Sequence, residues 1–195
     1  FNYNFAGNTI KTTTVFKYLN DTLTQSITFR GLIQTLEAEA DAVKRSVTIY
    51  QGPEGEEKAE RTFSYNFAGT AIKNTTVFKY DNDTLFKSIT YRGEISDVAS
   101  EAAAVKKSVS LYFGPEGEEK VERTFNYNFL GNTIKNTTVF IYDIQDKLDI
   151  RLSRSITYRG EIPDKAAEAM AIKRSITLYT GPEGEEKADW SYNYS

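Results

Sequence analysis

Residues 1–18 read FNYNFAGNTIKTTTVFKY, residues 63–80 read FSYNFAGTAIKNTTVFKY, and residues 125–142 read FNYNFLGNTIKNTTVFIY. The three stretches begin at a constant interval, since 63 − 1 = 62 and 125 − 63 = 62. A period of this length indicates one supersecondary unit copied in tandem. The expected copies cover residues 1–62, 63–124 and 125–189, and residues 190–195 begin a fourth first strand.

Each copy carries strand signals and one helix signal. In the middle copy, aromatic and β-branched runs predict strands near residues 63–67, 75–80, 88–91 and 108–112. Before the fourth strand, apolar residues recur at helical spacing after a candidate N-cap, Ser96 or Asp97. In the three copies these apolar positions are Leu36, Ala40 and Val43, then Val98, Ala102 and Val105, then Ala166, Met170 and Ile172. The sequence predicts an α+β fold: three tandem β-β-β-α-β repeats, antiparallel sheets each with one short helix.

The predicted repeats are joined by turns rather than by linkers. A Gly-Pro-Glu-Gly motif starts at Gly52, Gly114 and Gly181, and this composition favours a tight turn. We expect each motif to form a hairpin that crosses a repeat boundary. The third copy also has five extra residues within residues 143–153, at the expected tip of its second hairpin, where insertions are best tolerated.

Composition excludes several functions. The chain has 195 residues, a net charge of −3 and interspersed charges, which argues against nucleic acid as a partner. It has no cysteine and no histidine, so thiol and imidazole chemistry and most zinc or haem sites are excluded. No apolar run approaches the roughly 20 residues of a membrane span. We predict a non-enzymatic protein without cofactor or metal, in an intracellular or organellar compartment, because small secreted proteins commonly carry disulfides.

The repeated aromatic and arginine positions are the candidate partner-binding residues. Aromatic residues on the first two strands can form the sheet core, or part of them can meet another protein. The arginine that ends the third strand can pair with a local carboxylate or carbonyl, or it can anchor a partner's carboxylate. The candidate residues are Arg30, Arg92, Arg159, Tyr18, Tyr80, Tyr142, Phe16, Phe78 and Phe140.

Residues 75–109 read TTVFKYDNDTLFKSITYRGEISDVASEAAAVKKSV, a strand, a turn, a strand and an alanine-rich segment. This stretch resembles the small α subunits of cryptophyte phycobiliproteins and their red-algal relatives, the scaffolding proteins of the phycobilisome. In that family a β hairpin and a short helix clamp a phycobiliprotein β subunit. The family's bilin-binding Arg-Gly-Cys does not follow Phe78-Lys79-Tyr80-Asp81. The resemblance therefore implies a bilin-free scaffold of a light-harvesting antenna, in the chloroplast at the stromal face of the thylakoid.

Two hypotheses on function follow from these patterns. The first is a tandem-repeat scaffold or linker that binds several copies of a protein partner, which the resemblance identifies as phycobiliprotein β subunits. The alternative is a multivalent carbohydrate-binding module, in which exposed tyrosines and Trp190 stack on sugars.

Overall fold

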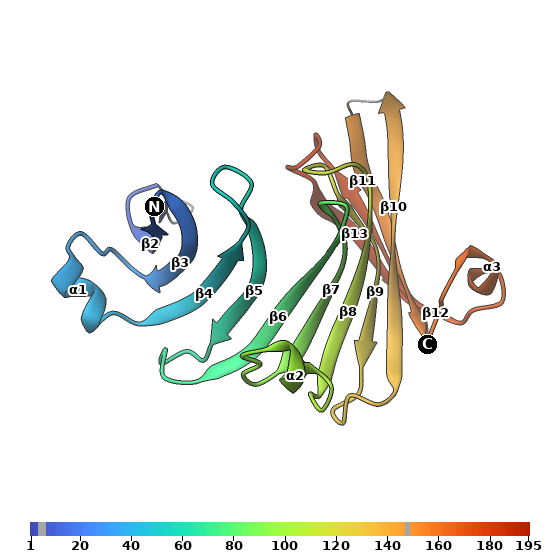
Figure 1. Cartoon of the computed structure of the whole chain (residues 1–195). Coiled ribbons are helices and arrows are strands. Elements are labelled where there is room, and N and C mark those ends of the chain that lie inside the picture. The colour runs from blue at the N-terminus through green and yellow to red at the C-terminus, as the bar shows by residue number, and fades with distance from the viewer. Residues whose placement is uncertain (4–6, 147–148) are drawn as a thin grey trace. The chain divides into compact units, whose positions relative to one another are not determined.

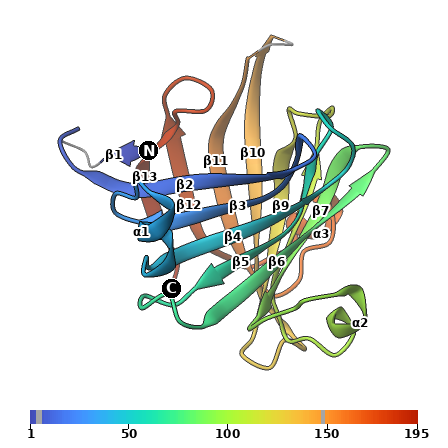
Figure 2. The ribbon, with the colours of Figure 1, turned by 60° about the vertical axis from the view of Figure 1, so that its left-hand side comes forward.

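The computed structural model describes residues 1–3, 7–146 and 149–195. These residues form antiparallel strands that follow one another in the sheet in the order of the sequence (Figure 1). Two compact units are distinguished, unit 1 with residues 1–79 and 90–104 and unit 2 with residues 80–89 and 105–195. Strands of unit 1, such as β2 to β5, lie side by side with their chain neighbours (Figure 2).

The strands of the first copy are β1 (Asn2–Tyr3), β2 (Ile10–Leu19), β3 (Thr22–Arg30) and β4 (Lys44–Gln51). Those of the second copy begin before its boundary and are β5 (Lys58–Tyr65), β6 (Ile72–Asp81), β7 (Thr84–Arg92) and β8 (Lys106–Phe113). The remaining strands are β9 (Lys120–Tyr127), β10 (Ile134–Asp146), β11 (Asp149–Arg159), β12 (Lys173–Thr180) and β13 (Lys187–Asn193). The helices are α1 (Leu36–Ala40), α2 (Val98–Glu101) and α3 (Lys165–Glu168).

The prediction of an α+β fold is wrong. The described residues form an almost entirely antiparallel β structure of 13 strands, and each helix is a single turn of four or five residues. The physical reason is the short return path of the chain. The Arg30 N–H already donates to the Val43 carbonyl at 2.9 Å, so residues 31–42 must leave the sheet and come back. A longer helix does not fit into such a connection.

The predicted apolar helix faces are also wrong. Val98 is 70% exposed and Met170 is 93% exposed, so neither contributes to a buried helix face. Val43 follows α1 and accepts the hydrogen bond at the end of β3 instead. Of the two N-cap candidates, Ser96 and Asp97, the structure selects Asp97, whose side chain accepts from the Ser100 N–H at 2.8 Å.

The hairpins expected at the Gly-Pro-Glu-Gly motifs are confirmed. These motifs connect the antiparallel pairs β4–β5, β8–β9 and β12–β13. Gly52 has φ +122°, and a Cβ there would lie 2.7 Å from the Glu56 carbonyl oxygen. Only glycine therefore suits this position. The five extra residues of the third copy lengthen the hairpin formed by β10 and β11, in which pairing extends to Asp146 and Asp149.

The two sides of the sheet differ in what they carry. In unit 2 the side with Val139, Ile156 and Tyr158, here called the covered face, packs against Ile162 and Ala167 of the connection that contains α3. The matching side of the strands in unit 1, with the buried residues Phe29, Val47 and Val77, has the same name. The opposite side, here called the hydroxyl face, carries rows of serine and threonine side chains. In unit 1 these rows include the pairs Thr14–Thr28 and Thr48–Thr62, and in unit 2 the pairs Ser110–Thr124 and Thr138–Thr157.

Candidate functional site

The hydroxyl face carries most of the residues predicted to bind a partner. In unit 1, Phe16 lies opposite Ser26, and Arg30 lies opposite Thr12. Ser26, Thr28 and Arg30 alternate along β3 and therefore share one face. At about 3.3 Å per residue, the four-residue step from Ser26 to Arg30 separates the two predicted anchors by roughly 13 Å. The structure thus brings Phe16 and Arg30 to one face without contact.

Arg30 contacts the ring of Phe67, a pairing that the sequence did not predict. Its guanidinium carbon lies 4.6 Å from the ring centroid of Phe67, a cation–π geometry. The Nε atom of Arg30 is buried without a hydrogen-bond partner among the described residues. Phe67 remains 85% exposed. Among the described residues, the local carboxylate partner that we considered for this arginine is not found.

The equivalent candidates occupy matching positions. In β6, Phe78 alternates with Thr76, and in β7, Arg92 alternates with Thr90, so both belong to the hydroxyl side of their strands. In unit 2, Arg159 lies opposite Asn136 and is exposed. Of the tyrosines, Tyr18 is exposed and Tyr80 is half-buried. Phe140 and Tyr142 of β10 differ, because both line a cavity in unit 2.

Hydrogen bonds hold the side chains of the hydroxyl face in place. The hydroxyls of Thr48 and Thr62 lie 2.9 Å apart, and those of Thr76 and Thr90 also lie 2.9 Å apart. A tyrosine of the fourth strand reaches a serine of the third strand in every copy. The three pairs are Ser26–Tyr50 at 3.1 Å, Ser88–Tyr112 at 3.0 Å and Ser155–Tyr179 at 3.2 Å. The face is therefore polar, half-buried and conformationally restricted.

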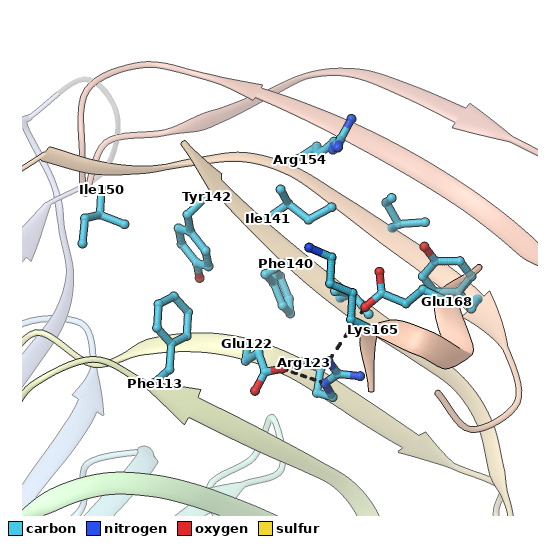
Figure 3. A pocket seen from close by; sticks show the side chains of 13 residues that line it. Phe113, Glu122, Arg123, Phe140, Ile141, Tyr142, Ile150, Arg154, Lys165 and Glu168 are labelled. Carbon is cyan, nitrogen blue, oxygen red and sulfur yellow. Dashed lines mark hydrogen bonds and ion pairs between the residues drawn. The ribbon is translucent and has the colours of Figure 1, made fainter. Parts of the chain in front are cut away.

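The cavity in unit 2 has a volume of about 580 Å³ and opens on the covered face beside α3 (Figure 3). Val139, Ile141 and Ile156 form its apolar floor. Figure 3 shows Phe113, Tyr142 and Ile150 toward one end, and Lys165 and Glu168 toward the other. The rings of Phe113 and Tyr142 meet edge to face, with centroids 5.6 Å apart. The cavity is therefore apolar at one end and charged at the other.

A buried arginine forms part of the charged end. The Arg123 side chain donates to the Ile162 carbonyl at 2.8 Å and to the Glu122 carboxylate at 2.7 Å, and it lies 3.8 Å from the Glu168 carboxylate. Its charge is thus compensated inside the protein. At the aromatic end the Tyr142 hydroxyl donates to the Val121 carbonyl at 2.9 Å. Burial raises the pKa of Tyr142 to about 12, with a smaller contribution from the negative charge of Glu186.

The features that sequence reasoning missed are recurrent polar contacts of the covered face. They include Arg61 and Arg123, each of which reaches a backbone carbonyl of the following connection. They also include the ion pair from Lys79 to Glu101. Comparing the three copies position by position would have indicated the cavity, because Ile141 stands where the first two copies have Lys17 and Lys79.

Two other kinds of site, a metal site and a membrane-spanning helix, were considered for the residues that the structure describes. Within the ranges that it describes, no group of three or more Asp or Glu residues is arranged to hold a metal ion. None of the helices found in these ranges is long and apolar enough to cross a membrane.

Comparisons with known proteins assign no family. No family profile matches the chain. No curated protein is significantly similar to it. The resemblance to phycobilisome scaffolding proteins, and with it the chloroplast location, stays a prediction.

Proposed function

We propose that the chain is a non-enzymatic repeat protein that binds protein partners on the hydroxyl face. The observation that carries the proposal is the shared placement of Phe16 and Arg30 on that face, with serine and threonine rows between them. The matching residues recur at the same positions of the second and third copies. A repeated surface of this kind suits a partner that is itself present in several copies.

The exposure and order of the face support this role. Phe16 is 53% exposed and therefore offers apolar area that a partner could bury. The neighbouring hydroxyls are already held by cross-strand hydrogen bonds, such as Thr14–Thr28 at 3.0 Å. Little side-chain freedom would therefore be lost on binding.

A carbohydrate ligand is the alternative, and the rows of hydroxyl groups beside aromatic rings favour it. Sugars present hydroxyls that can exchange hydrogen bonds with Thr48 or Thr62, and C–H faces that stack on aromatic rings. Such a ligand would depend on Phe16 but would not require Arg30. A protein partner with a carboxylate would require the arginine.

The test begins with affinity purification from the source organism and mass spectrometry, followed by calorimetry with the purified partner. We expect more than one binding site per chain. Phe16→Ser should remove one site, whereas Val98→Ser, at an exposed apolar residue of α2 outside the hydroxyl face, should leave the number of sites unchanged. In the phycobilisome hypothesis the partner is coloured and the protein itself is colourless.

The arginines decide between the two ligand classes. Combined replacement of Arg30, Arg92 and Arg159 by alanine should weaken protein binding strongly. Glycan-array binding that survives this replacement would instead favour the carbohydrate module. Equal partner binding by the wild type and by Phe16→Ser would contradict the proposed surface.

A further inference from the structure

The first two copies share an ion pair that the third copy lacks. On the covered face of unit 1, the Lys17 ammonium lies 2.6 Å from the Glu39 carboxylate, and the Lys79 ammonium lies 3.0 Å from the Glu101 carboxylate. In both cases the lysine lies near the end of a strand, and the glutamate belongs to the one-turn helix after the next strand. The side chain of the lysine therefore extends over the covered face toward the one-turn helix.

In the third copy this place is not filled by a lysine. Ile141 occupies the lysine position, while Glu168 keeps the glutamate position in α3. Glu168 lies 3.8 Å from Arg123. The space beside the shorter isoleucine side chain belongs to the cavity of about 580 Å³ (Figure 3). This volume lies within the range of small-molecule sites.

The apolar end of the cavity includes two residues without an apolar counterpart at the matching places, Phe113 of the second copy and Ile150 of the third. Phe113 stands where the preceding fourth strand has Gln51, and Ile150 belongs to the lengthened hairpin. Both line the cavity together with Tyr142. The ion pair has therefore been replaced by an apolar, partly aromatic wall, and the site differs from the matching places in the other copies.

The third copy has no cation at the position of Ile141, but two cationic side chains lie at the edge of the cavity. Arg154 and Lys165 line the cavity and are exposed, and neither makes an ion pair within the ranges that the structure describes. Lys165 stands where the second copy has Val98. Arg123 is already compensated by Glu122 and Glu168. The rim thus offers two cations beside an apolar floor.

We propose that this cavity binds a small amphipathic anion, with an alkyl or aromatic body on the Ile141 floor and an acidic head group near Arg154 and Lys165. A medium-chain carboxylate has this chemistry. The site differs from the hydroxyl face, because it opens on the covered face and uses none of the repeated arginines Arg30, Arg92 and Arg159. Of the residues predicted to bind a partner, Phe140 and Tyr142 line it.

The experiment uses the full chain with decanoate in calorimetry, and with the fluorescent anion 8-anilinonaphthalene-1-sulfonate in displacement assays. We expect one site per chain, shared by the two anions, and weaker binding at high salt. Decylammonium, with the same apolar body and the opposite charge, should bind at least about tenfold more weakly.

Two variants test the cavity itself. Ile141→Lys restores the residue of the first two copies, is expected to pair with Glu168, and should lower the affinity for decanoate at least about tenfold by filling the space. Arg154→Ala should weaken decanoate binding, whereas Arg174→Ala, the loss of an exposed arginine of β12 outside the cavity, should leave it unchanged. Circular dichroism checks that each variant folds.

Three results would overturn the proposal. These are wild-type affinity of the folded Ile141→Lys variant for decanoate, equal binding of decylammonium and decanoate, and no saturable binding of either anion by the wild type. A partner bound on the hydroxyl face would not be affected by Ile141→Lys, so failure of this site and failure of the proposed function are distinguishable.

Discussion

The hydroxyl of Thr75 donates a hydrogen bond to the carbonyl oxygen of Gly93 at 2.8 Å. The same hydroxyl oxygen accepts a hydrogen bond from the Ile95 N–H at 3.0 Å, and the threonine is fully buried. Thr13 and Thr137 make the matching pair of bonds in the other copies. One side chain in the covered face therefore fixes the start of each connection between the third and fourth strands.

Replacing this threonine should destabilise the protein. Thr75→Val keeps the shape of the side chain but leaves the Gly93 carbonyl and the Ile95 N–H without their partner, at a cost of about 1–3 kcal/mol in the free energy of unfolding. Thr76→Val, at a half-buried position of the hydroxyl face, should cost less than about 1 kcal/mol. Urea titrations measure both values. Equal losses for the two variants would contradict the role assigned to Thr75.

The Gly-Pro-Glu-Gly hairpin offers a matched pair of glycines. Gly55→Ala places a side chain at φ +80° with no atom within 4 Å of its Cβ, which costs roughly 1–2 kcal/mol of backbone strain. Gly52→Ala adds a contact of 2.7 Å with the Glu56 carbonyl oxygen and should therefore lower the melting temperature further. If Gly55→Ala proves the more damaging of the two, the hairpin has a different geometry.

Two glutamates follow each Gly-Pro-Glu-Gly motif, and the second of them stabilises a β-bulge. Glu57 accepts a hydrogen bond from the Leu23 N–H at 2.8 Å, beside the register shift between β2 and β3. Glu119 and Glu186 bind the N–H groups of Leu85 and Leu152 in the same way. The Leu23 N–H bond is the largest cause that holds the pKa of Glu57 below its ordinary value of 4.5.

This lowered pKa has a defined consequence for acid stability. Since the folded state favours ionised Glu57, the contribution is present above pH 4.5 and is lost as the pH falls through the lower pKa of the folded state. Glu57→Ala should therefore be less stable than the wild type at pH 7, and the difference should shrink in acid. Glu56→Ala is the control, because the Glu56 side chain has no hydrogen bond among the described contacts. Denaturant titrations from pH 7 to pH 3 measure the difference, and a gap independent of pH would contradict this explanation.

Stability should also fall at alkaline pH because of a buried tyrosine. Tyr91 is 2% exposed, and its hydroxyl donates to Glu101 at 3.5 Å. Burial, together with the charge of Glu101, raises the pKa of Tyr91 from 10.0 to about 12. The folded state keeps a proton that the unfolded state loses, so this contribution is complete below pH 10 and is lost as the pH rises through 12. Tyr91→Phe should flatten the fall in melting temperature between pH 10 and pH 12.

Local chemistry decides which features a single sequence can reveal. The period of 62 residues, the strands around Thr75 and Ser88, the N-cap Asp97 and the hairpins at Gly52 and Gly114 follow from neighbouring residues alone. Alternation, turn composition and capping act over a few residues, and they are therefore visible without the fold.

The length of the helices and the position of the cavity were decided by tertiary structure. The spacing of Val98 and Val105 is helical, but the chain must return to the sheet within a dozen residues, so only one turn forms. The cavity depends on which residues strand pairing and α3 bring together, because Ile141 and Glu168 are far apart in the sequence. By itself the sequence determined the repeat and its local turns, since these depend on adjacent residues. The covered face and its cavity depend on contacts between distant residues, which only the folded chain makes.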